Sequence, residues 1–288
     1  MKRFLAPALV AIFPLSITAA PLKTAIVTTV VKDVKMSENR AAPRSIGEGT
    51  KMTGASTILT GNASRAAMTF PDRTVTRVGA NSVFRFRSGS RDMEIAQGSF
   101  LLQVPKNSGG AKIRTATVTA AITGTTTLME FSPGKYIKFI CLEGTAELIN
   151  RKGEKVSIPA GYMLVMHPDD ESFPVPVQIN IEKTMKTALL ADRGIFGDLD
   201  EAAKEAIDRT IAAQREGRIN GDLHPSGLIN RGPGKENGYT RSLMSELFYV
   251  HGSNGNEQPP PSAGGGGFSG GNLSPGGGSF PDTFPNNP

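Results

Sequence analysis

The hydrophobic and polar positions of residues 22–168 fall into short runs that are typical of β-strands. The runs are rich in Val, Ile and Thr, as in 22–34, 82–86, 113–121 and 162–166. Turn sequences with Gly, Pro, Asn or Asp separate them, and a turn is predicted at Gln97–Gly98 between the strands 93–96 and 99–104. Strands repeating about every 8–12 residues indicate a sandwich, a barrel or a solenoid. No helical period interrupts this stretch, which disfavours a parallel nucleotide-binding sheet. The pattern predicts an all-β domain over residues 22–168.

Two of these runs show which side chains face the core. In 83–87 the sequence is Val-Phe-Arg-Phe-Arg, so Phe84 and Phe86 lie on one face of a strand and the two arginines lie on the other. In 136–141 the same alternation places Ile137, Phe139 and Cys141 on one face. We expect these apolar sets to face the core.

Residues 178–220 change to a helical period and predict an α-helical appendage. Ile181, Met185, Ala188 and Leu189 fit one amphipathic helix, which Gly194 and Gly197 interrupt. Asp198 is a candidate N-cap for a second helix, and Gly217 is a natural end for it. The second helix has a modest, alanine-rich apolar stripe, which suits close packing on another surface: Leu199, Ala203, Ala206, Ile207 and Ile211.

The two ends of the chain predict export and disorder. Residues 1–20 begin with a basic head, continue with an apolar stretch and end in small residues, as secretory signals do. The alternative is an uncleaved N-terminal anchor helix, although three prolines and an early lysine disfavour it.

Residues 221–288 are interpreted as a linker and a Gly/Pro-rich tail, because 252–288 contain 11 Gly and 7 Pro in 37 residues. Such a composition predicts disorder.

Charge and composition exclude several classes of function. The net charge of +6, with a pI near 9.5, falls to 6 − 2 = +4 without the two basic leader residues, so the chain has no strong signature of a nucleic-acid-binding protein. A single cysteine excludes an internal disulfide framework and a cysteine-rich metal site. Four tyrosines and no tryptophan leave few platforms for stacking sugars or bases.

Three local patterns are candidate sites. The string Gly267–Gly271 matches a nucleophile elbow, but Gly- and Pro-rich flanks replace the strand and helix that such an elbow needs. His167 with the three carboxylates of 169–171 offers either a divalent-metal site or a solvated acidic loop, and the irregular spacing favours the loop. Cys141 is interpreted as a buried free thiol, with an intermolecular bridge as the alternative.

A cluster of five arginines within 19 residues is the remaining candidate surface, and Asp72 and Asp92 accompany it. One interpretation is that the cluster binds an anionic glycan, lipopolysaccharide or an acidic protein surface. The alternative is that it forms the solvent-exposed face of two strands. Its members are Arg73, Arg77, Arg85, Arg87 and Arg91.

Three blocks of residues 46–166 resemble the FecR domain, the periplasmic part of ferric-citrate-regulator-type proteins. The blocks are 46–66, 68–82 and a third group with Gly124-Thr125, Glu143-Gly144 and Gly161. The resemblance implies a twisted β-solenoid or roll, with a β-sandwich as the alternative. Arg73 stands where the family usually has glycine, and Ala116 replaces a common proline, so we expect those turns to differ.

The resemblance also implies a role in envelope signalling, but only Met1–Arg3 precedes the leader here. We therefore expect an exported module that does not itself hold a sigma factor in the cytoplasm. The predicted role is non-enzymatic protein interaction in signalling or scaffolding, with another envelope protein as partner. The alternatives are an envelope adhesin or matrix component and, third, a hydrolase. No catalytic, cofactor-binding or metal-binding residue is assigned, no cofactor is expected, and no nucleic-acid partner is expected.

Overall fold

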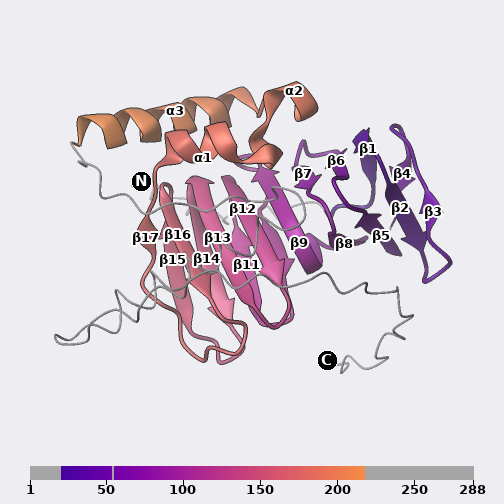
Figure 1. The fold of residues 1–288 in the computed structure, drawn as a ribbon, viewed down its shortest axis with the longest axis horizontal. Helices are drawn as coiled ribbons and strands as arrows, with labels where there is room; N and C mark the ends of the chain where they lie inside the picture. Colours follow the sequence, from indigo (N-terminus) through magenta and orange to yellow (C-terminus); the bar gives the residue numbers. More distant parts are fainter. Residues whose placement is uncertain (1–20, 54, 218–288) are drawn as a thin grey trace, which may run out of the picture. The chain divides into compact units, whose positions relative to one another are not determined.

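The computed structural model describes residues 21–53 and 55–217. Our expectations for the leader, for residues 221–288 and for Gly267–Gly271 therefore lie outside the described residues. Within the described part, strands dominate, and the all-β prediction for residues 22–168 is confirmed (Figure 1). No helix in that part is both long enough and apolar enough to cross a bilayer.

The 17 strands hydrogen-bond into one mixed sheet that is folded into two layers. We call the first layer the capped layer. In hydrogen-bonded order it contains β4 (Lys51–Met52), β1 (Ala25–Val31), β6 (Arg65–Thr69), β7 (Val75–Val78), the second half of β9 (Asp92–Val104), β12 (Thr125–Ser132), β13 (Tyr136–Glu143), β16 (Tyr162–Met166) and β17 (Val177–Gln178).

We call the second layer the exposed layer. It contains, in order, β3 (Arg44–Ser45), β2 (Val34–Glu38), β5 (Ala55–Thr60), β8 (Val83–Arg87), the first half of β9, β10 (Ala111–Arg114), β11 (Val118–Ile122), β14 (Thr145–Asn150) and β15 (Lys155–Pro159). All the pairings are antiparallel except that of β9 with β10.

Strand β9 is the one strand that belongs to both layers. It pairs with β8 as far as Gln97 and with β12 from Gly98 onward. Gly98 has a φ of +106°, and a Cβ there would lie 2.0 Å from the Oγ of Ser82, so only glycine fits at this crossing. The sequence predicted a turn at Gln97–Gly98 between two strands. That prediction was wrong, because the glycine lets a single strand bend from one layer into the other.

The main hydrophobic core lies between the two layers. Phe84 of the exposed layer and Phe100 of the capped layer meet with their ring centroids 5.9 Å apart. Ile137, Phe139 and Cys141 belong to this core, as do Phe84 and Phe86, so both predicted alternation patterns are confirmed.

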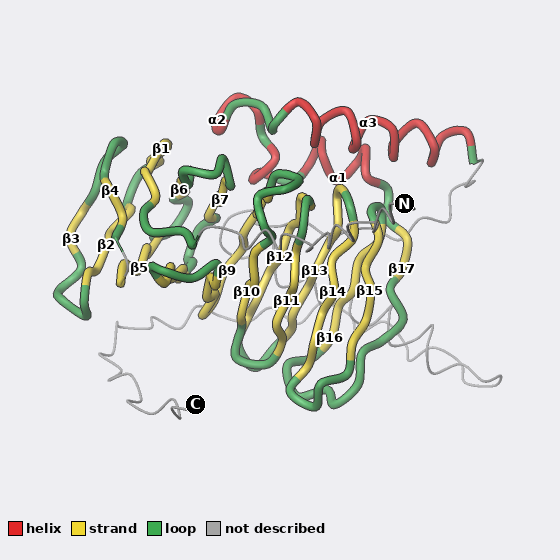
Figure 2. Tube along the Cα trace, turned by 180° about the vertical axis from the view of Figure 1, so that it is seen from behind, coloured by secondary structure: helices red, strands yellow, loops and turns green. Residues whose placement is uncertain are grey.

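The helical segment follows the strands and lies on one side of them (Figures 1 and 2). It consists of α1 (Ile181–Thr187), the short 3-10 helix η1 (Leu189–Ala191), α2 (Arg193–Phe196) and α3 (Glu201–Glu216).

Two details of this segment differ from the sequence-based expectation. The first helix ends at Thr187 because Ala188 is extended, with a ψ of 113°, and this break buries Leu190 in place of Leu189. The N-cap of the long helix is Asp200, whose side chain accepts from the Ala202 N–H at 3.1 Å, and not Asp198. Gly217 ends that helix as predicted.

The first predicted strand, 22–34, is also interrupted. Lys32 has a φ of 60°, so the chain turns there and separates β1 in the capped layer from β2 in the exposed layer. This turn brings the N-terminal strands into both layers.

The turn between β6 and β7 holds a strained arginine. The Asp72 carboxylate accepts from the Thr74 N–H at 3.0 Å and from the Thr74 hydroxyl at 2.9 Å. Arg73 has a φ of 65°, in the left-handed region that glycine favours. We expected a turn of different geometry at Arg73; instead the arginine adopts a backbone that would suit glycine. Its side chain is exposed.

Replacing this arginine should stabilise the protein. A left-handed backbone costs an ordinary residue roughly 1–2 kcal/mol of folding free energy. Glycine avoids this strain but costs about 0.5–1 kcal/mol, because it loses more conformational entropy on folding. We therefore expect Arg73→Gly to raise the free energy of unfolding by about 0.5–1 kcal/mol, measured by urea denaturation. Arg73→Ala, which keeps the strain, is the matched control. Equal stability of the two variants would contradict this account.

Candidate interaction surfaces

On the face of the capped layer that points away from the main core, the helical segment covers the part formed by β9, β12, β13 and β16. Leu101, Leu128, Ile140 and Met163 lie on this face and form a second core with residues of the helices, including Leu190 and Ile207. Every residue of β12 from Thr125 to Phe131 is buried. This part of the capped layer is therefore buried on both faces. We call α1, η1, α2 and α3 together the cap.

A buried ion pair lies on the same face of the capped layer. Lys138 is completely buried, and its Nζ lies 2.6 Å from an Oε of Glu130, which is itself buried. The hydroxyl of Tyr136 donates to the other oxygen of Glu130 at 2.7 Å. Since Lys138 and Glu130 are opposite each other on β13 and β12, the pair spans the sheet. Removing one member of such a pair would leave the other as an uncompensated buried charge and would lower the stability of the fold.

Arg77 fastens the cap to the capped layer. Its guanidinium donates to the carbonyl oxygens of Leu190 at 3.0 Å, Gly197 at 3.1 Å and Asp198 at 3.3 Å. The ring of Phe196 lies 5.1 Å away, at cation–π distance. Burial lowers the pKa of Arg77 to about 10, and the nearby Asp198 partly opposes this shift, so the side chain stays cationic at neutral pH.

The five arginines of the sequence cluster do not form one surface. Arg77 is buried beneath the cap, and Arg91 is paired with Asp72. Arg73 lies in its turn, whereas Arg85 and Arg87 project from β8 on the solvent side of the exposed layer. The prediction of a single arginine face was therefore wrong, because the cluster spans a turn and both layers.

The solvent side of the exposed layer is nevertheless rich in charge. Alternation places charged residues opposite the core-facing side chains on β2, β8, β9, β10, β14 and β15. Ion pairs join Arg85 to Glu94 at 2.7 Å and Arg114 to Asp92 at 3.3 Å. We call this surface the charged face. Its basic members outnumber its acidic members by six to three: Lys35, Arg85, Arg87, Lys112, Arg114 and Lys155 against Asp92, Glu94 and Glu147.

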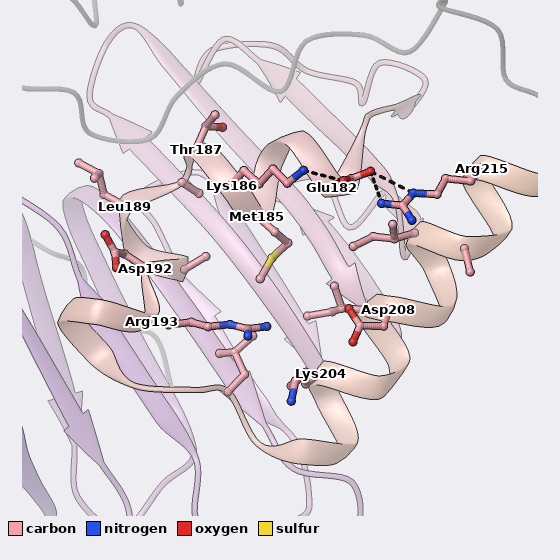
Figure 3. A pocket seen from close by; sticks show the side chains of 16 residues that line it. Glu182, Met185, Lys186, Thr187, Leu189, Asp192, Arg193, Lys204, Asp208 and Arg215 are labelled. Atoms are coloured by element: carbon pink, nitrogen blue, oxygen red, sulfur yellow. Dashed lines mark hydrogen bonds and ion pairs between the residues drawn. The ribbon is translucent and has the colours of Figure 1, made fainter.

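A groove of about 640 Å³ opens in the cap between α1, η1 and α2 on one side and α3 on the other. Figure 3 shows Met185 pointing into it, with charged side chains around it. At one end, Glu182 pairs with Lys186 at 2.6 Å and with Arg215 at 2.8 Å. These two hydrogen-bonded cations lower the pKa of the exposed Glu182 to about 2. The groove is an open, apolar-floored cleft of the size that binds small ligands or short peptide segments.

The remaining candidates occupy structural positions. The backbone N–H of His167 donates to Asp170 at 2.7 Å, and Glu171 pairs with Lys152 at 2.5 Å, so these side chains shape their own loop. Across residues 21–53 and 55–217, no three His, Cys, Asp or Glu side chains gather as a metal site would require. Cys141 is buried and free, as predicted, and burial raises the pKa of its thiol to about 12.

Comparison with known proteins identifies the central part of the chain. Residues 56–147, from β5 to β14, match the family model described as FecR protein. These residues form a FecR domain. The match lies within the range 46–166 on which the sequence resemblance rested. It includes Arg77 and the buried ion pair, whereas the cap and its groove lie outside it.

Solved structures resemble part of the chain only distantly. Two crystal structures of a candidate anti-sigma factor from Parabacteroides distasonis ATCC 8503, at 1.65 Å and 2.50 Å resolution, are similar to part of it. They are 15% and 14% identical, each with a TM-score of 0.38, and cover 42% and 43% of this chain. The matches span 59% and 60% of those chains. No curated protein matches the sequence.

The groove was missed in the sequence analysis although its signal was present. The stripe on α3 was expected to pack on another surface, and Ala203 and Ile207 do so. Two of the other members, Leu199 and Ile211, line the groove and are only partly buried. An apolar stripe on a helix that is wider than the part packed against the sheet indicates such a groove.

Loss of Arg77 should release the cap from the FecR domain. Arg77→Met removes the charged donor from three carbonyl groups of the cap, so we expect a loss of about 3 kcal/mol in the free energy of unfolding. Amide hydrogen exchange should rise most in residues 189–217. Arg77→Lys, which keeps the charge but not the planar set of donors, should have an intermediate effect. Unchanged protection of residues 189–217 in Arg77→Met would contradict this role.

Glu143 provides a test of buried charge. Burial raises the pKa of Glu143, while a hydrogen bond from the Thr126 hydroxyl at 2.9 Å and Lys106 at 3.9 Å partly oppose the shift. The folded chain thus holds this proton more tightly than the unfolded chain does. The resulting stabilisation is complete below the ordinary carboxyl pKa and is lost as the pH rises through the folded pKa.

Accordingly, Glu143→Gln should raise the melting temperature more at pH 7 than at pH 4, because the cost of the buried carboxylate grows as Glu143 ionises with rising pH. The gain should vanish at pH 4 and below, where Glu143 is protonated in the folded protein. Thermal denaturation monitored by circular dichroism at both pH values measures this. Glu147→Gln, at an exposed carboxylate on β14, is the control. A gain that is independent of pH would argue against the buried charge as its cause.

Proposed function

We propose that this chain is an exported, non-enzymatic protein-interaction module that acts in cell-envelope signalling or scaffolding. The observation that carries the proposal is the FecR match over residues 56–147. The family is associated with regulation through protein contacts and not with catalysis, so the proposal includes no catalytic residue and no cofactor. The basic and apolar pattern of residues 1–20 supports export to the periplasm or to the medium.

The charged face is the surface that we assign to the partner. It belongs to the layer that the cap leaves uncovered, and its basic residues exceed its acidic ones by 6 − 3 = 3. Arg87 is exposed at the end of β8, and Lys112 is exposed on β10. A surface with this charge excess steers and orients an acidic partner more than it adds affinity. We therefore propose an acidic face of another envelope protein as the partner.

A second candidate function is that of an envelope adhesin or matrix component. The composition of residues 252–288, with 11 Gly and 7 Pro, favours it because such a segment serves as a spacer. In that case the bound material would be peptidoglycan or polysaccharide.

Photo-crosslinking in the native cell envelope distinguishes these candidates. A photoreactive residue placed at Thr57, between β2 and β8 on the charged face, should capture one defined protein. We expect Arg85→Glu combined with Arg87→Glu to reduce that capture at least tenfold, and raised salt to reduce it as well. Lys183→Glu, a charge reversal at an exposed position on α1, is the control and should leave capture unchanged.

The proposal fails if the charge-reversed variant captures the same protein as efficiently as the native chain. Capture of peptidoglycan or polysaccharide in place of a protein would support the adhesin or matrix role.

A further inference from the structure

The groove in the cap combines an apolar floor with fixed walls. Met185, Leu199 and Ile211 line it and are only partly buried, so they expose apolar surface there. Exposed apolar surface of this kind on an otherwise polar molecule marks a binding site.

The walls of the groove are held at both ends, so the groove is preformed. At one end Arg77 binds the carbonyl oxygens of η1 and of the α2–α3 connection. At the other end the side-chain amide of Gln214 donates to the Ile179 carbonyl at 2.7 Å and accepts from the Ile181 N–H at 3.1 Å. These contacts tie α3 to the start of α1. A cleft held open in this way offers its apolar surface without a cost of rearrangement.

The sequence beyond the cap contains a segment that matches this groove. Residues 242–250 read Ser-Leu-Met-Ser-Glu-Leu-Phe-Tyr-Val and form the densest apolar run in 218–288. Leu243, Met244, Leu247 and Phe248 recur at spacings of one, three and one, which places them on one face of a helix. Amphipathic segments bind apolar grooves through such a face.

We propose that residues 242–250 of this same chain dock into the groove between α1 and α3. The first argument is reach. Helix α3 ends at Glu216, and Arg215 in its last turn lines the groove, so the chain leaves α3 beside the site. The 24 residues of 218–241 span up to about 80 Å, whereas α3 is about 24 Å long. The segment therefore reaches every part of the groove.

The second argument is charge. The groove is lined by four basic and three acidic side chains, an excess of 4 − 3 = +1: Lys186, Arg193, Lys204 and Arg215 against Glu182, Asp192 and Asp208. The segment 242–250 carries a single charge, that of Glu246. The two surfaces are complementary in sign as well as in apolar character. Covalent connection also raises the local concentration of the segment to the millimolar range, above that of any partner in solution.

With this docking, the groove in the cap would be occupied by residues 242–250 of the same chain. A partner that uses the groove would first displace residues 242–250, so its apparent affinity would be its intrinsic affinity multiplied by the fraction of grooves that the segment leaves free. The charged face lies on the other layer, so this inference stands independently of the partner proposed for that face.

Disulfide trapping in the full chain tests the docking. Met185→Cys is combined with one cysteine at each position from 242 to 250 in turn, and the rate of disulfide formation is measured by mass spectrometry under mild oxidation. The native Cys141 is buried and does not interfere. We expect intramolecular disulfides to form at least ten times faster for cysteines at Leu243, Met244, Leu247 or Phe248 than for the Ser245 or Glu246 controls.

Two further variants sharpen the test. Phe268→Cys paired with Met185→Cys samples another phenylalanine of the C-terminal region and should form its disulfide at least ten times more slowly than Phe248→Cys. Adding Leu247→Asp to the Met185→Cys/Phe248→Cys pair should slow trapping about tenfold, and it changes no residue of the described fold. Equal rates at all positions would overturn the proposal. Disulfides formed between two chains would assign the groove to a second copy and would overturn it as well.

The experiment uses purified protein and needs no envelope partner. Its failure would leave the proposal for the charged face intact, and failure of envelope crosslinking would leave this one intact.

Discussion

Burial of β9, β12, β13 and β16 on both of their faces is the constraint on which the structure depends. Strands β12 and β13 contribute Phe131, Phe139 and Cys141 to the core between the layers, and Leu128 and Ile140 to the opposite side. A sheet that is apolar on both sides must be covered on both sides. The exposed layer supplies one cover and the cap supplies the other, so the helical segment is an integral part of the fold and not an accessory to it.

This constraint divides the roles of the surfaces. Where the cap meets the capped layer, buried polar side chains bind partners within the protein. Arg77 donates to carbonyl groups of the cap, and Lys138 pairs with Glu130. The outer face of the exposed layer is not covered by the cap, so its charged side chains point to solvent. The groove arises because α3 covers the sheet with Ala203 and Ile207 while other members of its apolar stripe face α1. The two proposed binding surfaces, the charged face and the groove, thus consist of side chains that are not needed to bury the sheet.

The sequence predicted the strand-rich class, the core faces of two strands and the end of the long helix at Gly217, because these depend on local alternation and capping. It did not predict that Ile140 and Leu142 are buried as fully as their neighbours Phe139 and Cys141. Continuous apolar runs such as 139–142 do indicate two covered faces, but alternation alone concealed this. The position of Arg77 could not be foreseen, since its partners lie 113 to 121 residues away and only the folded chain brings them together.

The pairing pattern around β9 has a mechanical consequence. Strands β1 to β8 pair only among themselves and with β9, and strands β10 to β17 pair only among themselves and with β9. Every ladder hydrogen bond that connects the N-terminal half to the C-terminal half therefore involves one strand. When the two halves are pulled apart, the backbone load passes through β9, and rupture of its ladders separates two groups of strands whose own pairings remain intact.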